Sequence, residues 1–354
     1  MDWSVILIAT AKIVVIYGAL LSSIPILTWA ERRGAAFIQD RPGPNRVGPF
    51  GLFQPMADFV KFLWKEDPIP LNVNKLLYVM GPFLTLIPAS LTIAAIPVAE
   101  SAVIFGREIP LQIADLNVGI LYILSIGSLG IYGILFGGWA SNNKFSLLGA
   151  MRSSSQMISY EIPLALSAAG AVLVFGSFSL REMVQMQDGT VLGFLPAWGI
   201  CLQPLGFLIF LVASFAETNR IPFDLPEAEA ELVAGYHTEY GSMKFATFFM
   251  AEYMNMVTIS ALMVVLFLGG WHLPWVSDAF LLDKLGSVNG LALVQALVFL
   301  AKVGFLVCFY IWIRWTLPRF RYDQLMRLAW SNLLPLSLFN LVATAFVMYL
   351  GSLS

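Results

Sequence analysis

The sequence has few charged residues and very few of the side chains that hold metals or form disulfides. Charged residues make up 12% of the 354 residues, whereas soluble proteins average about 25%. Only two cysteines are present, Cys201 and Cys308, and both lie in apolar segments, where we expect small buried hydrophobic side chains. Two such thiols exclude a disulfide framework and an iron–sulfur cluster, which usually needs four thiolates.

Nucleotide and haem sites also lack their usual signals. The sequence contains no G-x-G-x-x-G after a strand and no G-x-x-x-x-G-K-[ST], so no dinucleotide or nucleoside triphosphate site is indicated. The two histidines, His237 and His272, fall outside the expected membrane spans, which argues against a haem held by paired histidines within the bilayer. We therefore expect any redox cofactor to belong to a partner.

Long apolar stretches dominate the chain instead. Hydrophobic residues make up 58% of the sequence, and the mean hydropathy is +0.79. A helix needs roughly 20 apolar residues to cross a bilayer, and such windows occur at about 4–30, 76–98, 117–139, 157–175, 195–216, 245–270, 291–313 and 329–351. We predict an all-α integral membrane protein in which 1–354 form a single polytopic domain of about eight transmembrane helices.

The distribution of basic residues sets the expected orientation. The first window is too long for a signal-peptide core and has its basic residues on the far side, so we read it as a retained first span. The odd-numbered connections between spans hold 15 Lys and Arg, against 3 in the leading segment and the even-numbered connections. By the positive-inside rule, odd-numbered connections face the cytoplasm or the mitochondrial matrix, and both termini face the periplasm or intermembrane space.

The first inner connection combines an irregular loop with a short helix. Residues 31–51, "ERRGAAFIQDRPGPNRVGPFG", carry three prolines and three glycines near their end, which excludes a regular helix or a central strand. Residues 52–66 then place polar side chains at spacings of four, three and four among apolar ones, which predicts an amphipathic helix at the inner interface. An ordinary interfacial anchor is the alternative interpretation.

The third inner connection, 217–244, is unusually acidic. It gathers six carboxylates, from Glu217, Asp224, Glu227, Glu229, Glu231 and Glu239. Acids near a helix start gain about 0.3–1 kcal/mol from the helix dipole, which is one explanation. Neighbouring buried carboxylates raise one another's pKa and titrate as a coupled set, so a proton-handling cluster is the other. Glu161 and Glu252, within or beside spans, favour the second, because charges at that depth usually line polar cavities.

Several long motifs resemble one known family, in the same order along the chain. They are "ERRGAAFIQDRPGPNRVGPFGLFQPMADFVKFLWKED", "GWASNNKFSLLGAMRSSSQMISYE", "AETNRIPFDLPEAEAELVAGYHTEY", "FFMAEY" and "LPRFRYDQLMRLAW". They resemble the membrane subunit of respiratory complex I that forms the quinone chamber, the H subunit of the bacterial NADH-quinone oxidoreductase. The resemblance covers nearly the whole chain.

The resemblance implies roles for particular residues. It implies that the 31–51 loop, the amphipathic helix and the inner ends of the first and sixth spans shape a tunnel for a lipid quinone, with Arg32 and Arg41 near its path. It also implies that an acidic series couples the quinone chamber to proton movement. That series is Glu161, Glu217, Asp224, Glu227, Glu229, Glu231 and Glu252.

The resemblance further implies cofactors, partners and location. The chain itself would bind no redox cofactor or metal and carry no catalytic residue alone; quinone would be the substrate, and FMN and iron–sulfur clusters would lie in partner subunits. Partners would be the other membrane and peripheral subunits, the quinone and membrane lipids, with no nucleic acid. The membrane would be the bacterial inner membrane or the mitochondrial inner membrane.

Two other functions stay open on the sequence. A stand-alone proton-coupled secondary transporter would also suit eight spans with buried acids, but it predicts inverted repeats with broken helices, and no such symmetry is found. The equivalent subunit of a membrane-bound hydrogenase or ferredoxin-linked complex is the second alternative, because soluble partners determine the electron donor.

Overall fold

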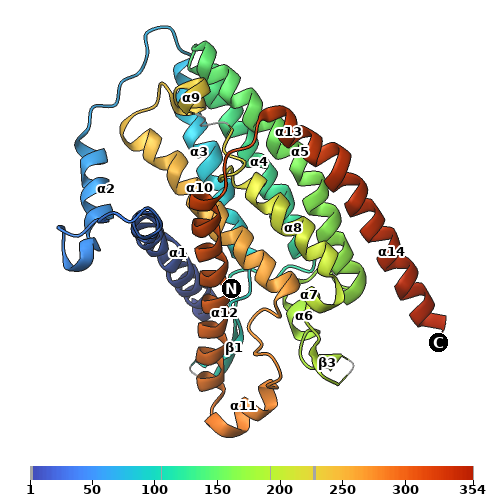
Figure 1. Cartoon of the computed structure of the whole chain (residues 1–354). Coiled ribbons are helices and arrows are strands. Elements are labelled where there is room, and N and C mark those ends of the chain that lie inside the picture. The colour runs from blue at the N-terminus through green and yellow to red at the C-terminus, as the bar shows by residue number, and fades with distance from the viewer. Residues whose placement is uncertain (1–2, 105, 192, 226–228, 354) are drawn as a thin grey trace.

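The computed structural model describes residues 3–104, 106–191, 193–225 and 229–353. Helices make up most of it (Figure 1). The long helices are α1 (Trp3–Ile38), α3 (Lys75–Leu91), α4 (Gly119–Ala140), α5 (Lys144–Phe175), α10 (Ser242–Phe267), α12 (Val288–Thr316) and α14 (Leu334–Leu353). The shorter helices are α2 (Gln54–Trp64), α6 (Leu180–Gln185), α7 (Gly199–Leu202), α8 (Pro204–Glu217), α9 (Glu229–Leu232), α11 (Asp278–Leu285) and α13 (Tyr322–Arg327).

Short strands and single turns complete the structure. The strands form two antiparallel hairpins, β1 (Ala99–Ile104) with β2 (Arg107–Leu111) and β3 (Thr190–Val191) with β4 (Leu195–Pro196). The 3-10 turns are η1 (Pro49–Gly51), η2 (Thr92–Ala95) and η3 (Gly235–His237), and η4 (Leu328–Leu333) is a π-helical turn.

The described residues contain seven helices that are long and apolar enough to cross a membrane. The seventh, Tyr322–Gly351, runs through α13, η4 and α14. The shorter apolar helix α8 occupies the region of the expected fifth span, and α7 precedes it. The all-α membrane fold predicted from composition is therefore confirmed, and one of the eight expected spans is shorter than the rest.

The helices pack around a row formed by α3, α4, α5 and α8. In this row α4 contacts α3 and α5, and α5 contacts α8 on its other side (Figure 1). The helix α14 lies along α5, while α10 packs against α3 and α12, and α1 packs against α10 and α12. Residues 261–267 of α10 are all buried, so this helix runs through the centre of the apolar core.

The two cysteines do not lie in that core. Cys201 on α7 and Cys308 on α12 are both exposed, so the expectation that they are buried is wrong. An apolar side chain on a membrane helix can face lipid as well as protein, and the apolar character of the segment does not distinguish the two.

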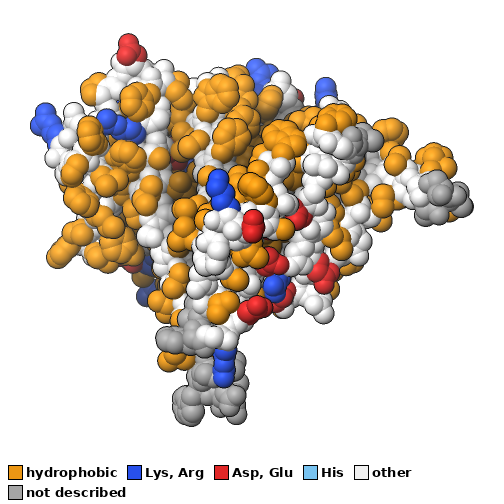
Figure 2. Space-filling view, turned by 90° about the horizontal axis from the view of Figure 1, so that it is seen from below, with side chains coloured by type: hydrophobic (Ala, Val, Ile, Leu, Met, Phe, Trp, Pro, Cys, Tyr) orange, Lys and Arg blue, Asp and Glu red, His pale blue; other side chains and the backbone are white. Residues whose placement is uncertain are grey.

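The segments that link the helices differ between the two ends of the bundle. The α2–α3 link and α9 lie at the upper end in Figure 1, whereas α11 and both hairpins lie at the lower end. Figure 2 views this lower end, where Asp and Glu side chains gather toward the middle of a largely hydrophobic surface. The upper end carries the segments that the sequence assigns to the inner side.

The amphipathic helix after the first span is present as α2. It runs from Gln54 to Trp64, and a proline at its second position suits the first turn. Its apolar side chains are largely exposed, including Trp64 at 80%, while Asp58 is partly buried toward α1. This distribution is what an interfacial helix requires, since one face meets apolar surroundings and the other carries charge.

One lysine closes the lower end of α10. The Lys302 ammonium, from α12, donates to the carbonyl oxygens of Leu268, Gly270 and His272 at 2.6, 3.0 and 2.6 Å. It also lies 4.2 Å from the centre of the Trp198 ring. The last carbonyls of a helix have no intrahelical donors, so this cation satisfies them and fixes α10 to α12.

Glycines allow the backbones of α3 and α4 to approach closely. A Cβ added at Gly133 would lie 2.6 Å from the Thr85 backbone nitrogen and 2.7 Å from the Gly81 oxygen. One added at Gly81 would lie 2.9 Å from the Gly137 Cα. Small residues at such contacts let helix backbones meet in a membrane, where packing drives association.

We predict that Gly133→Ala destabilises the protein by about 1–3 kcal/mol, because the added methyl overpacks the α3–α4 contact. Gly130→Ala is the matched control on the same helix, since a Cβ there meets nothing within 4 Å. The measurement is the thermal unfolding midpoint of the two purified variants in detergent. Equal midpoints would contradict the close-packing explanation.

Candidate functional site

A buried arginine joins three separate elements near the upper end of the bundle. Arg220, in the loop after α8, has a side chain only 4% exposed. Its Nη1 lies 3.0 Å from Glu31 Oε2 on α1, and its Nε lies 2.7 Å from Glu252 Oε1 on α10. Its guanidinium also stands 4.6 Å from the centre of the Tyr253 ring. A cation between two carboxylates therefore ties α1 to α10.

Further charged groups extend this cluster. Arg314, on α12, pairs with Glu31, and the Tyr253 hydroxyl donates to Glu31 Oε2 at 2.7 Å. Nearby, Arg319 Nη2 lies 3.1 Å from Asp224 Oδ2. Three carboxylates thus face three guanidinium groups, and buried charges are tolerated when they are paired in this way.

The neighbouring carboxylates outweigh burial in setting the pKa of Arg220. Burial by itself would lower the pKa, but the carboxylates of Glu252 and Glu31, with the Tyr253 hydroxyl, hold it well above its usual value. The guanidinium therefore stays charged and keeps the two carboxylates in place at any physiological pH.

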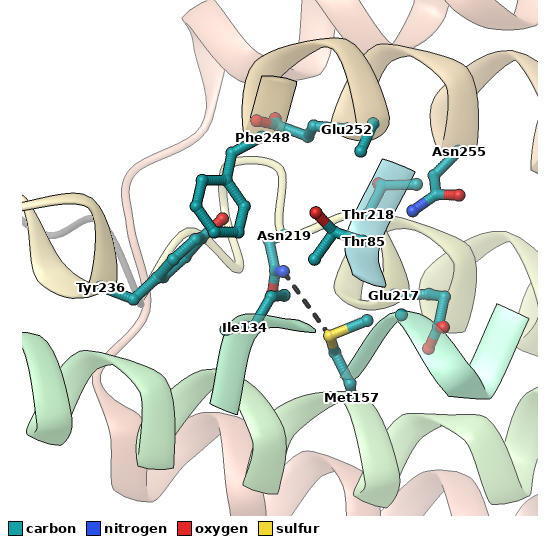
Figure 3. Close-up of a pocket in the computed structure, with 12 residues that line it drawn as sticks. Thr85, Ile134, Met157, Glu217, Thr218, Asn219, Tyr236, Phe248, Glu252 and Asn255 are labelled. Atoms are coloured by element: carbon teal, nitrogen blue, oxygen red, sulfur yellow. Dashed lines mark hydrogen bonds between the residues drawn. The ribbon is translucent and has the colours of Figure 1, made fainter. Parts of the chain in front are cut away.

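Two small cavities continue from this cluster into the bundle. The first is lined by Glu252 and Glu217 together with Asn219 and Tyr236 (Figure 3). The second is lined by Glu217 and Glu161, and the Ser128 hydroxyl donates to Glu161 Oε1. Glu217 lies on both cavities, so three of the carboxylates singled out in the sequence lie along one connected route.

Local contacts determine where Glu217 lies. The Gln156 side-chain amide, buried on α5, donates to the carbonyl oxygens of Ala216 and Phe223 at 2.9 and 2.8 Å. It therefore holds both ends of the turn that contains Glu217 and Arg220. Because this turn supplies both residues, one amide positions the ion-pair cluster and the cavity together.

The rest of the acidic loop has a different setting. Glu231 has a side chain 54% exposed and pairs with Arg152 of α5 at 2.7 Å, away from the cavities. Glu239 accepts from the Asn143 amide at 2.6 Å. Glu229 begins α9, whose first side chains are not described, and Glu227 lies outside the described residues.

The end of the acidic loop packs against α5 and against a cluster of phenylalanine side chains. A Cβ at Gly149 of α5 would lie 2.7 Å from the Gly235 Cα, so the two backbones are in contact. His237 is packed among Phe245, Phe248 and Phe249, and burial lowers its pKa to about 3. A neutral imidazole is therefore part of the packing that holds Tyr236 at the first cavity.

The two arginines assigned to the quinone path lie near the end of α1 and in the loop after it. The expectation that all of 31–51 is irregular is wrong, because α1 continues to Ile38 before the prolines begin. Arg32 directly follows Glu31 but is half-exposed, and its Nη1 lies 2.5 Å from Asp58 Oδ2 on α2. Burial would raise the pKa of Asp58, but Arg32, with Lys61, holds it below its usual value. Arg41 is exposed, and its Nε donates to Gln39 Oε1 at 2.7 Å.

Sequence reasoning missed Glu31, Arg314 and Arg319 as members of the site. Glu31 stands at the end of the first apolar window, and the two arginines follow the seventh, where they counted only toward orientation. An ionisable residue at a span end is ambiguous, because it also suits a headgroup contact. The glutamate preceding two arginines in "ERRG" was the available signal.

Sequence comparison identifies the family. A sequence model of the NADH dehydrogenase family matches residues 11–345. An H subunit of the NADH-quinone oxidoreductase of Solibacter usitatus is 46% identical, with 97% of each chain covered, and one of Cytophaga hutchinsonii is 50% identical, with 90% of each covered. The H subunit of Thermomicrobium roseum is 48% identical, with 99% of each chain covered. The chain belongs to the family of NADH-quinone oxidoreductase H subunits.

This membership confirms the resemblance drawn from the sequence motifs. In this H-subunit chain, the conspicuous chemistry consists of buried carboxylates and guanidinium groups. No group of three or more His, Cys, Asp or Glu among the described residues is placed to hold a metal ion. Of these carboxylate and guanidinium groups, the carboxylates are the ones that can gain or lose a proton, while the guanidinium groups stay charged.

We predict that Arg220→Met lowers stability by about 3–5 kcal/mol, because it removes the cation between two buried carboxylates. The double variant Arg220→Met/Glu252→Gln should recover much of this loss, since Glu31 keeps its pairing with Arg314. The thermal unfolding midpoint of the purified protein measures both effects. A single variant as stable as the parent protein would contradict the structural importance of the pair, and so would a double variant no better than the single one.

Proposed function

We propose that the chain is the membrane subunit of a proton-pumping NADH-quinone oxidoreductase that forms the quinone chamber with soluble partners. It couples reduction of the quinone to proton translocation. The observation that supports this most directly is the connected buried polar route. The route runs from Glu31, beside Arg32, through Arg220 and Glu252 to the cavities that hold Glu217 and Glu161.

The chemistry of quinone reduction explains why such a route is useful. A quinone that becomes a quinol gains two electrons and two protons, and the electrons would come from FMN and iron–sulfur clusters in partner subunits. Negative charge that develops near Arg32 and Arg41 alters the field at the adjacent Glu31–Arg220 pair. The buried carboxylates respond by changing their proton occupancy, because a low dielectric makes them sensitive to nearby charge.

The surroundings of the site suit these partners. The loop that follows α1, residues 39–51, and α2 lie together at the end of α1 (Figure 1), and in this proposal a membrane-soluble quinone enters there from the lipid. The inner loops present basic and acidic groups to soluble subunits. The membrane is the bacterial inner membrane or the mitochondrial inner membrane, with both termini on the opposite side from these loops.

The names of the relatives favour this function over the alternatives. The relatives from three different organisms are all named as NADH-quinone oxidoreductase subunits. A stand-alone transporter would not need exposed and half-exposed arginine side chains beside an interfacial helix. We assign the proton-coupling role to Glu161, Glu217 and Glu252, which line the cavities, and to Asp224, which pairs with Arg319. Glu227, Glu229 and Glu231 stay candidates for the same role.

We predict that Glu161→Gln lowers quinone reductase turnover and proton translocation together by about 10²-fold, because the amide keeps the shape but cannot release a proton. The assembled complex is reconstituted in vesicles, and NADH-driven quinone reduction and proton uptake are measured on the same sample. NADH oxidation by a soluble artificial acceptor serves as the assembly control. Full activity in both coupled assays would contradict the relay and leave Glu161 as a structural partner of Ser128.

We predict that Arg41→Ala raises the apparent KM for quinone and weakens inhibition by quinone-site inhibitors by about tenfold, the loss expected for one charge-assisted hydrogen bond. Arg46→Ala is the matched control, since Arg46 is exposed on the same loop. Steady-state kinetics of both variants in the assembled complex give the comparison. An unchanged KM and unchanged inhibitor sensitivity would show that Arg41 instead contacts lipid phosphate or braces the loop.

A further inference from the structure

The two cavities meet at a polar neck. Glu217, Thr218 and Asn255 line both of them, whereas Glu252 lines only the first and Glu161 only the second. In Figure 3 the Glu252 and Glu217 side chains point in different directions. Besides Glu217, the side chains that both cavities share are Thr218 and Asn255, so a proton that moves from one cavity to the other passes beside these two neutral side chains.

We propose that Thr218 and Asn255 are positioning residues that hold hydrogen-bonded water across this neck. Through that water a proton passes between Glu252 and Glu217. This inference rests on the proposed function and adds to it the residues that join the two halves of the route.

The cavities have room for water. The space open to the centre of a water molecule is about 30 Å³ in the first and about 40 Å³ in the second. One water needs roughly 10–15 Å³ by this measure. Each cavity can therefore hold at least one water, which is enough to bridge side chains that do not touch.

Two buried oxygens at the second cavity support the same conclusion. Among the residues that the structure describes, Glu217 Oε2 and Thr258 Oγ1 are fully buried and form no hydrogen bond with the protein. Both residues line the second cavity. Buried polar atoms nearly always have a partner, and ordered water commonly supplies it.

The two neutral side chains at the neck can bind water but cannot hold a proton near neutral pH. A carboxamide has two N–H donors and one carbonyl acceptor. The Thr218 hydroxyl donates to the Ser214 carbonyl at 3.0 Å and can still accept from water, so both side chains can orient water. Neither titrates near neutral pH, so neither traps the proton. When the Glu217 carboxyl releases its proton to the first water, the last water gives a proton to the Glu252 carboxylate beside Arg220, and the water keeps no net charge.

Apolar side chains line part of both cavities. Phe248 faces the first cavity, and Ile259 and Leu262 face the second. These side chains offer water no hydrogen bonds, so the polar neck decides whether a continuous chain of water can form. An apolar side chain at Asn255 would interrupt it.

The test compares Asn255→Leu, which is similar in size but apolar, with Asn255→Ser, which is polar and leaves more space. Ser260→Ala is the control on the same helix, because the Ser260 hydroxyl bonds to the Met256 carbonyl at 2.7 Å. The assembled complex in vesicles is assayed for quinone reduction, proton uptake per electron, and the effect of D2O on the rate. NADH oxidation by a soluble artificial acceptor confirms assembly.

We expect Asn255→Leu to lose proton translocation by about tenfold or more and to show a larger D2O effect on the remaining rate. Asn255→Ser should keep most of the activity, Thr218→Val should resemble Asn255→Leu, and Ser260→Ala should match the parent. Parent-like translocation and D2O effect in Asn255→Leu would overturn the inference. Equal losses in the leucine and serine variants would also overturn it, because the exact asparagine would then be needed for shape.

Glu217→Gln separates this inference from the proposed function. If Glu217→Gln pumps normally, the proposed proton route through Glu217 is itself wrong. If Glu217→Gln fails while Asn255→Leu pumps normally, the route stands and only the polar neck is wrong.

Discussion

The Arg220 guanidinium is the interaction on which the arrangement of the site depends. It stands between carboxylates from α1 and α10, and Arg314 of α12 completes the group through Glu31. Arg220, Glu31 and Glu252 are largely withdrawn from water, so each stays buried only while its partner is in place. The pairing therefore fixes three helices relative to one another at the point where the inner loops meet the bundle.

The same pairing connects two different chemical regions. Glu31 belongs to the helix whose inner end carries Arg32 and the proline- and glycine-rich loop, and Glu252 lines the first cavity. In the proposed function, a change of charge at the loop acts on the cavity through this one guanidinium. This short electrostatic path gives a physical basis for coupling a reaction at the membrane surface to protons inside the bundle.

Close backbone contacts support this electrostatic core. Gly81 and Gly133 let α3 and α4 meet, and Gly149 lets the end of the acidic loop lie on α5. Gln156 then holds the turn that contains Glu217 and Arg220. Packing thus decides where the charges stand, and the charges in turn hold helices that have little hydrophobic reason to associate in lipid.

Much of the fold could be predicted from the sequence because it follows from local properties. The length of each apolar stretch determines whether it can span a bilayer, the excess of Lys and Arg in alternate connections indicates orientation, and the spacing of polar residues over 52–66 predicts α2. Glu161 and Glu252 could be singled out for the same reason, since a carboxylate in an apolar segment is costly wherever it lies, and Glu217 because it belongs to an unusually acidic loop. The tertiary structure alone decided which charges meet. Glu31 and Arg220 are far apart in the sequence, as are Arg314 and Glu31, so no local pattern could pair them. Glu231 and Glu217 share one acidic loop, yet one pairs with Arg152 at the surface and the other lies between two cavities. The cost of burial is a property of each residue, but its partner is determined by how distant helices pack, and that packing is what separates a cavity carboxylate from a surface one.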